Sequence, residues 1–479
     1  MSIVVFIAYI AITFCIGFYI SSRNKKTKDF FLASGGLSIP QVMALLFAEL
    51  IAGAGTVGVA ADAYRSGVNA VWVNWGMSIG CFFFVFTVAG LMKAISVRRN
   101  VMSVAEVYQH LFDRRTRLVM TLIVTATYSI HFSTQPKAAA AIISPLLGGL
   151  NPVLCAWIIT AVFLVLTLTG GLHGLANMNL LHSLVMYLGL RVIAVLAVNA
   201  AGGFGHITRT LAPEFFDLSQ PSIWKAFSTA FGSAISLVAA ATVANATFAA
   251  KSIKHAKNGI ILASVFVVIF ALFPCFIGIA ARIVLPNIDK PDETLYLMAN
   301  NIGPIFSGIA GIAIIAAIFS SAPAHLLLIA ATVTKDFYVP FINKEASEHE
   351  QMRFSRIVIV IIAAFATFFG LRSSSILSQI SSALQIRSIA GAVLIAAVYW
   401  RKISNTAVFW SLIVGGTLSP LWNYMGNPFG IPSLYPSLVL GLIVLFVLSL
   451  VIKQKDEPAH DKAKRIMAEY KAEIAAQKG

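Results

Sequence analysis

Charge is what this sequence has least of. Asp, Glu, Lys and Arg make up only 11% of its 479 residues, and 58% of the residues are hydrophobic. A soluble protein carries about 25% charged residues. This composition excludes an ordinary soluble protein, and the long apolar runs predict an all-α protein that crosses a membrane many times.

Cysteine is also scarce. The chain has four, and each falls inside an apolar stretch: Cys15, Cys81, Cys155 and Cys275. We interpret them as packing residues, with neither a disulfide framework nor a metal site. The phosphate-binding pattern GxxxxGK[ST] is missing, which excludes ATP-driven pumping by this chain. The first apolar segment is followed by RNKKTK without a small-residue cleavage site, so it is predicted to be a retained span rather than a signal peptide.

The apolar runs predict about thirteen transmembrane helices. Their expected bounds are 3–21, 38–62, 70–95, 118–147, 152–170, 177–200, 227–249, 258–285, 303–334, 354–371, 376–400, 404–422 and 432–452. An odd number of spans places the two termini on opposite sides of the membrane.

The basic residues predict which side is which. Of the 35 lysines and arginines, 26 fall in one set of loops and the tail, and six fall in the other set. Because cytoplasmic loops are enriched in Lys and Arg, we expect a multi-pass protein of the cell membrane with its N-terminus outside and its C-terminus in the cytoplasm. The net charge of +16 is thus a topology signal, and no nucleic-acid partner is expected.

One predicted span carries unusual residues. Within Met43–Gly58 the sequence MALLFAELIAGAGTVG holds Gly53, Gly55 and a lone carboxylate, Glu49. Each glycine weakens a helix by about 1 kcal/mol relative to alanine. Backbone freed at membrane depth is tolerated where it lines a cavity or is buried in protein. The stretch therefore indicates either a binding site at a broken helix or a close contact between helices through small residues.

Four stretches, taken together, resemble the sodium/solute symporter family. They are KDFFLASGG at 28–36, the broken span running into AYRSG at 63–67, AAKSIKHAKNG at 249–259, and AAIFSS at 316–321 followed by TKDFY at 334–338. They occur in the family's order and spacing, and the likeness covers nearly the whole chain.

The resemblance implies a five-plus-five inverted repeat of the leucine-transporter type, in which the first and sixth core helices are discontinuous. The repeats would cover about 38–200 and 227–400, within a transporter core at 35–402. An extra N-terminal span and a basic cytoplasmic loop would occupy 1–34. Two further spans would lie at 403–452, and a charged cytoplasmic tail at 453–479.

The resemblance also implies a site for Na⁺, the expected coupling ion. Sodium prefers oxygen ligands, and the family takes carbonyls from the broken helix and a carbonyl with two serine hydroxyls from a later span. The matching residues here are Ala48, Ile51, Ala317, Ser320 and Ser321. From the residues alone, a serine in a membrane helix more often bonds the carbonyl one turn back in its own helix.

A second sodium site is not expected. Some relatives build one from an aspartate and from serines one turn beyond the Ser-Ser pair. This chain has Asn179 at the aspartate position and Pro323 and Ala324 at the later positions. It therefore lacks the carboxylate and the hydroxyls that a second ion needs.

The residues expected to face the solute are small or apolar. They are Leu50, Ala52, Ala54, Gly55 and Asn74, with Trp72 and Trp75 as neighbours. Such a wall cannot replace the hydrogen bonds of a hydroxyl-rich solute, which argues against a sugar.

Arg387, on the tenth core helix, is a candidate partner for a carboxylate, because a guanidinium matches it with a two-bond fork. Glu49 could neutralise Arg387 or hold the amino group of a zwitterion. The free amides of the broken helix could provide a second anion site.

Other ionisable residues at membrane depth have two readings each. Lys137 could be functional or paired, Arg191 could extend its head group to the membrane surface, and His325 could be a packed histidine or a proton carrier. His182 is a further candidate proton carrier.

The leading hypothesis is a secondary transporter, not an enzyme, that imports a small organic solute, a carboxylate or an amino acid, with one Na⁺. The alternatives are a proton-coupled or uncoupled transporter of the same fold, and a non-transporting membrane sensor. The expected partners are the solute and the lipid bilayer, and no obligatory protein partner is evident.

Overall fold

The structure is a computed structural model that describes residues 9, 13, 35–372, 375–454 and 456–476. The described chain is helical almost throughout, and its isolated β-bridge joins Leu37 to Ala250. The predicted first span and its basic loop lie outside the described residues, apart from Tyr9 and Thr13. Eight helices in the described part are long and apolar enough to cross a membrane, so an all-α membrane protein is confirmed and the count of thirteen spans stays a prediction.

The predicted break in the first core helix is present. Helix α3 (Ile39–Ile51) ends at Ala52, whose φ of 44° lies in the left-handed region that disfavours side chains. The chain resumes as a π-helical turn, η2 (Ala54–Gly58), and continues as α4 (Val59–Ser66). The span is therefore two half-helices joined by irregular backbone.

A second break interrupts the span predicted at 227–249. Helix α11 (Ile223–Val238) ends before Ala239 and Ala240, and α12 (Ala241–Ala249) follows directly. No glycine or proline marks this break in the sequence. It lies in the span that the resemblance implies is discontinuous, while the assignment of that span as the sixth core helix stays a prediction.

The helices between the two breaks include the longest helices of the described chain. They are η3 (Gly67–Val71), α5 (Trp72–Thr87), α6 (Ala89–Arg99), α7 (Val104–Leu111), α8 (Arg114–Leu146), α9 (Pro152–Ala200), α10 (Phe204–Thr210) and η4 (Pro213–Phe216).

The second half of the chain is also helical. It contains α13 (Ile253–Phe270), α14 (Leu272–Val284), η5 (Pro291–Glu293), α15 (Thr294–Ile302), α16 (Pro304–Val333), η6 (Thr334–Ile342), α17 (Glu348–Gly370), α18 (Ile376–Tyr399), α19 (Asn405–Tyr424), η7 (Pro428–Gly430), α20 (Leu434–Val451) and α21 (Ala459–Ala476).

Helix α9 covers two predicted spans, 152–170 and 177–200, without an interruption in its helical assignment. Phe163 packs against Phe319 with ring centroids 5.7 Å apart, and Asn179 donates a hydrogen bond to the carbonyl of Ser320. Residues sixteen positions apart in α9 thus meet adjacent residues of α16, whereas a straight helix would separate them by about 24 Å. These contacts favour a bend in α9 between Phe163 and Asn179, and its division into two spans stays a prediction.

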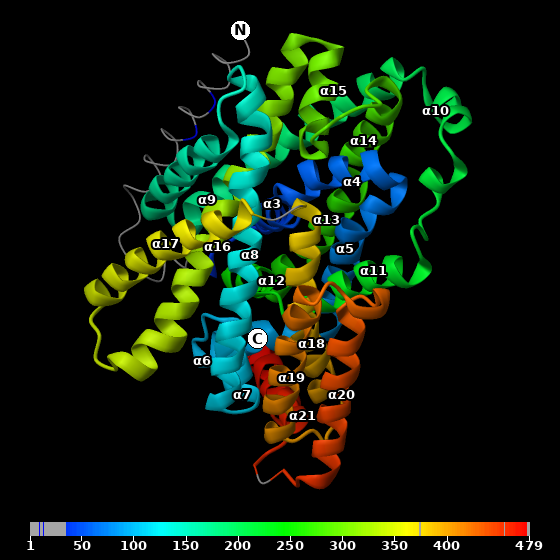
Figure 1. The fold of residues 1–479 in the computed structure, drawn as a ribbon. Helices are drawn as coiled ribbons and strands as arrows, with labels where there is room; N and C mark the ends of the chain where they lie inside the picture. The colour runs from blue at the N-terminus through cyan, green and yellow to red at the C-terminus, as the bar shows by residue number, and fades with distance from the viewer. Residues whose placement is uncertain (1–8, 10–12, 14–34, 373–374, 455, 477–479) are drawn as a thin grey trace.

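Helix α16 is the centre of the molecule, because it packs against α9, α8 and the broken span. The short helices α10 and α15 lie at one end of the molecule, and α6, α7 and α21 lie at the other (Figure 1). These two groups are the segments predicted to be external and cytoplasmic. We refer to the two ends as the outer and inner ends.

Candidate functional site

The predicted cation ligands lie where α16 meets the broken span. Ala48, Ile51, Ala317, Ser320 and Ser321 are all buried, and α16 contacts both α3 and η2. The Ser320 hydroxyl donates to the Ala317 carbonyl at 2.7 Å, and the Ser321 hydroxyl donates to the same carbonyl at 3.0 Å. A hydroxyl that donates keeps its oxygen lone pairs as acceptors. Both hydroxyls thus bond a carbonyl one turn back in their own helix, the alternative that the residues left open, and both serine oxygens lie beside the Ala317 carbonyl. Their role as sodium ligands stays a prediction.

Asn179 adjoins this group. Its Nδ2 donates to the Ser320 carbonyl at 3.3 Å, while its Oδ1 is buried without a hydrogen-bond partner. Pro323 and Ala324 are buried one turn further along α16. The surroundings of Ser320 thus offer a neutral amide where the family pattern has a carboxylate.

Glu49 is paired with His325. The Oε1 atom of Glu49 lies 2.6 Å from Nε2 of His325, and the two residues are 9% and 0% exposed. A buried charge needs such a partner. The pairing with Arg387, one of the expectations from the sequence, is absent: Glu49 and Arg387 each bond to other groups.

Arg387 bonds to the end of α11. Its Nε donates to the Ser236 carbonyl at 3.1 Å and to the Ser236 hydroxyl at 2.8 Å, and its guanidinium carbon lies 5.2 Å from the centre of the Tyr128 ring. The side chain is 2% exposed, and its Nη1 has no hydrogen-bond partner. The ion pairs among the described residues do not include Arg387. No carboxylate of the described residues therefore pairs with its buried positive charge.

Three rings join the Glu49–His325 pair to Arg387. The ring centroids of Tyr128 and His131, of Tyr128 and His325, and of His131 and His325 are 5.4 to 5.6 Å apart. The Tyr128 hydroxyl lies 2.9 Å from the hydroxyl of Thr242 and accepts from the Thr242 amide at 3.1 Å. We call Glu49, Tyr128, His131, His325 and Arg387 the central cluster.

The central cluster lies between the two breaks. Glu49 precedes the first break by three residues, while Ser236 and Thr242 lie on either side of the second. Sequence reasoning missed Tyr128, His131 and Ser236. The available signal was the one-turn spacing of Tyr128 and His131 on a predicted span, but a tyrosine and a histidine at that spacing are also ordinary core residues.

The apolar wall predicted for the solute is buried near the first break: Leu50, Ala52, Ala54 and Gly55. Asn74 is fully buried, and its Nδ2 donates to the Gly55 carbonyl at 3.3 Å. A Cβ atom on Gly55 would lie 3.0 Å from Oδ1 of Asn74, so glycine permits this close approach.

Trp72 and Trp75 hold other parts of the chain. Their indole N–H groups donate to the carbonyls of Leu218 and Val268. The Gly53 amide is not a free anion site either, because it donates to Oε1 of Gln135 at 3.0 Å. The expectation of a second anion site at this half-helix is therefore wrong for the Gly53 amide.

Of the three remaining ionisable candidates, two have partners within the protein and one is exposed. Lys137 forms an ion pair with Asp292 at 3.3 Å, and Nδ1 of His182 forms a short hydrogen bond with the Tyr9 hydroxyl. Arg191 is exposed, as expected for a side chain that extends to the membrane surface.

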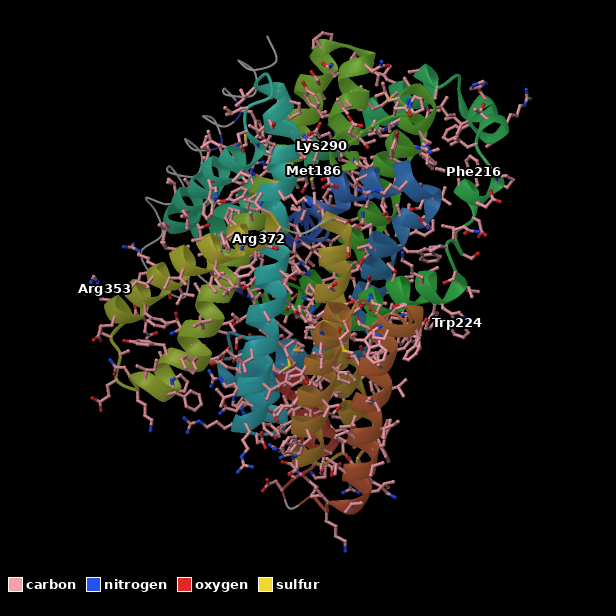
Figure 2. The ribbon with its side chains drawn as sticks, in the orientation of Figure 1. Met186, Phe216, Trp224, Lys290, Arg353 and Arg372 are labelled. Carbon is pink, nitrogen blue, oxygen red and sulfur yellow. The ribbon has the colours of Figure 1, made fainter. Side chains whose placement is uncertain are left out.

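A cavity of about 570 Å³ is lined by residues of α4, η3, η4, α11 and α18, and the five residues of the central cluster are not among them. Phe216 and Trp224, close in sequence to lining residues, lie at the edge of the molecule (Figure 2). Gln385 lines this cavity two residues before Arg387, and Ser228 lines it two turns before Ser236. Its lining also includes the polar residues Asp62, Arg65, Lys225, Ser378, Ser381 and Ser382.

Comparison with protein families gives a match to the model of the sodium:solute symporter family over residues 30–415. The osmoregulated proline transporter OpuE of Bacillus subtilis is 23% identical over 465 residues, which are 92% of each chain. The sodium/proline symporter of Escherichia coli is 23% identical over 472 residues, covering 94% of this chain and 93% of the relative.

Two solved structures have the same fold. A Na⁺-coupled sialic acid symporter in a substrate-bound, outward-open state matches with a TM-score of 0.81 at 19% identity, covering 95% of this chain and 99% of the other. The nucleobase-cation-symport-1 family transporter Mhp1, with bromovinylhydantoin bound, matches with a TM-score of 0.62 at 15% identity, covering 93% and 99%.

Proposed function

The chain belongs to the sodium:solute symporter family, and from this premise we propose that it imports a small organic solute bearing a carboxylate together with one Na⁺. The solute binds at the central cluster, between the two helix breaks. Sodium binds at Ala48, Ile51, Ala317, Ser320 and Ser321. Ala48 directly precedes Glu49, and Ser321 lies one turn before His325, so the two sites share α3 and α16.

The main support for a solute carboxylate is the buried environment of Arg387 and its lack of an acidic partner. A guanidinium that is 2% exposed, has no protein carboxylate among the described residues and leaves Nη1 unbonded is costly to bury. A solute carboxylate supplies both the missing charge and the missing acceptor. The polar cavity lined by Gln385 and Ser228 lies near this position in sequence, two residues before Arg387 and two turns before Ser236.

Glu49 adds a carboxylate, hydrogen-bonded to His325, to the central cluster that contains Arg387. A site with one fixed positive and one fixed negative group complements a zwitterion, so an amino acid fits it better than a simple anion. Two of its relatives, OpuE of Bacillus subtilis and the Escherichia coli symporter, are proline transporters, which supports proline as the first solute to test. Leu50, Ala52, Ala54 and Gly55 form the apolar wall against which a small side chain or ring packs, and Asn74 adjoins Gly55.

The test is uptake of L-proline and other small amino and organic acids into proteoliposomes, with and without an inward Na⁺ gradient. Uptake that requires Na⁺, is abolished in Arg387→Gln and is strongly weakened in Arg387→Lys supports the proposal, because lysine cannot reproduce the guanidinium fork. The exposed Arg209→Gln serves as the control and should transport normally.

Three outcomes would contradict the proposal. Wild-type affinity in both Arg387 variants, or an uncharged solute, would show that the solute does not bind through a carboxylate. Uptake driven by a proton gradient alone would establish the proton-coupled alternative. Failure to transport or bind any solute would favour a membrane sensor.

A further inference from the structure

We propose that His131 is the second donor to the solute carboxylate, beside Arg387, and that it sets the preference for a carboxylate over the corresponding amide. The inference rests on the proposed function, since it concerns the same solute site. It adds a specificity-determining residue that the sequence pattern did not indicate.

The first observation is an unbonded nitrogen. His131 is 9% exposed, and its Nε2 is buried without a hydrogen-bond partner. Buried polar atoms are bonded in the large majority of cases, so each exception calls for a cause. The Nη1 of Arg387 and the Nδ1 of His325 are two more such atoms in the central cluster, and the side chains of His131 and Arg387 contact or adjoin the ring of Tyr128.

The side chains one turn before and one turn after His131 on α8 both have hydrogen-bond partners, unlike Nε2 of His131. Tyr128, one turn before, bonds through its hydroxyl to Thr242. Gln135, one turn after, accepts from the Gly53 amide and donates to the carbonyl of His131. The side chains on either side in this row therefore have partners within the protein, whereas His131 leaves Nε2 unused. A purely structural histidine on this helix face would be expected to bond as they do.

The chemistry of the two donors matches one ligand group. A carboxylate has two oxygens and accepts from two donors at once, and hydrogen bonds to a charged group are about twice as strong as neutral ones. An imidazole protonated on Nε2 donates there, and Arg387 donates from Nη1. A carboxamide offers one oxygen and an N–H₂ group, so it leaves one donor without an acceptor. Two donors on different helices thus discriminate between an acid and its amide.

The test compares acids with their own amides in two matched variants. Glutamine places its amide nitrogen about where Nε2 of histidine lies, whereas asparagine is too short and reaches only the Nδ1 position. His131→Gln therefore keeps a donor, and His131→Asn removes it. Inhibition constants against Na⁺-dependent binding are measured for L-proline and L-prolinamide, L-alanine and L-alaninamide, and lactate and lactamide.

We expect His131→Asn to weaken binding of the preferred acid about 10- to 100-fold, the effect of one hydrogen bond to a charged group, with its amide unchanged. His131→Gln should retain most of the preference. His182→Asn, at a buried histidine bonded to Tyr9, is the control and should behave as the wild type. Na⁺-induced thermal stabilisation of each variant shows that it is folded.

The outcomes separate this inference from the proposed function. A wild-type protein that prefers none of the acids to its amide contradicts both. A wild-type protein with a preference that His131→Asn leaves intact contradicts the role of His131 alone. Equal weakening of acid and amide, or an equal loss in His131→Gln and His131→Asn, makes His131 a structural residue.

Discussion

The Oε1 atom of Glu49 lies 2.6 Å from Nε2 of His325 and so joins the broken helix α3 to α16. Both residues are buried, and each lies within one turn of a proposed sodium ligand, Ala48 on α3 and Ser321 on α16. The hydrogen bond therefore connects the proposed cation site with the central cluster. Binding of sodium between the same two helices would hold Glu49 in its place at the solute site.

The first prediction concerns the two halves of this pair. Glu49→Gln keeps an acceptor for His325, so we expect it to cost only about 1 kcal/mol of stability. His325→Ala leaves a buried carboxylate without its partner and should cost about 3–5 kcal/mol. Thermal unfolding of the purified variants measures both. Equal losses in the two variants would show that the charge of Glu49 is not compensated by His325.

The second prediction concerns the sodium ligands. Ser321→Ala removes a buried oxygen of the proposed site and should raise the Na⁺ concentration for half-maximal uptake at least several-fold. Ser320→Ala should act in the same direction. Ser264→Ala is the matched control, because Ser264 is equally buried and bonds the Ile260 carbonyl of its own helix, α13. Unchanged sodium activation in both site variants would overturn the assignment.

The third prediction is a coupling ratio of one Na⁺ per solute. Asn179 is neutral, and Pro323 and Ala324 have no hydroxyl, so a second buried cation would have no carboxylate to balance it. The reversal potential of solute-driven currents, measured at several Na⁺ gradients, gives the ratio directly. A value near two would contradict the expectation of a single sodium site.

The sequence indicated the first helix break because glycine and a lone carboxylate are out of place in a membrane span. The second break, at Ala239 and Ala240, has no such local signal. Its expectation came from the family resemblance alone, because alanine is a good helix former and the interruption is imposed by packing around it.

Partners of the buried charges could not be predicted in the same way. The sequence identified Glu49, His325 and Arg387 as unusual, but which of them pair depends on the rotation of α3, α16 and α18 about their axes. The structure pairs Glu49 with His325 and leaves Arg387 beside Ser236. His131 was missed because a histidine in an apolar helix is uninformative until the partners of its nitrogens are known.

The fourth prediction tests the packing that holds Arg387 near α11. A Cβ atom on Gly391, one turn beyond Arg387 in α18, would lie 1.9 Å from the Ile235 carbonyl oxygen. The two helices must separate to admit a methyl group, so Gly391→Ala should cost about 3 kcal/mol and weaken solute binding. Gly205→Ala in α10 is the control, because nothing lies within 4 Å of its added Cβ atom. If Gly391→Ala unfolds at the wild-type temperature, α18 and α11 are not in this close contact.

The last prediction contrasts a buried with an exposed ion pair at the inner end. Asp336, in η6, is fully buried and accepts from Nη2 of Arg117 at 2.6 Å and from the hydroxyl of Ser103 at 2.9 Å. The pair thus ties α8 and the start of α7 to the end of α16. Asp461, at the start of α21, accepts from Arg401 at 2.8 Å, but this arginine is 73% exposed.

Removing one partner of a buried pair leaves an uncompensated charge, so Asp336→Asn should cost about 3–5 kcal/mol. Water and salt already screen the exposed pair, and Asp461→Asn should cost less than about 1 kcal/mol. Thermal unfolding at low and at high salt separates the two cases, because only the small effect at Asp461 should fade as ionic strength rises. An Asp336→Asn protein as stable as Asp461→Asn would mean that the other acceptors of the Arg117 guanidinium suffice: Gln109 at 2.7 Å, the Lys335 carbonyl at 2.8 Å and the carboxylate of Glu106 at 3.2 Å. The double variant Glu106→Gln with Asp336→Asn would then show the full loss, since it removes both carboxylates from Arg117.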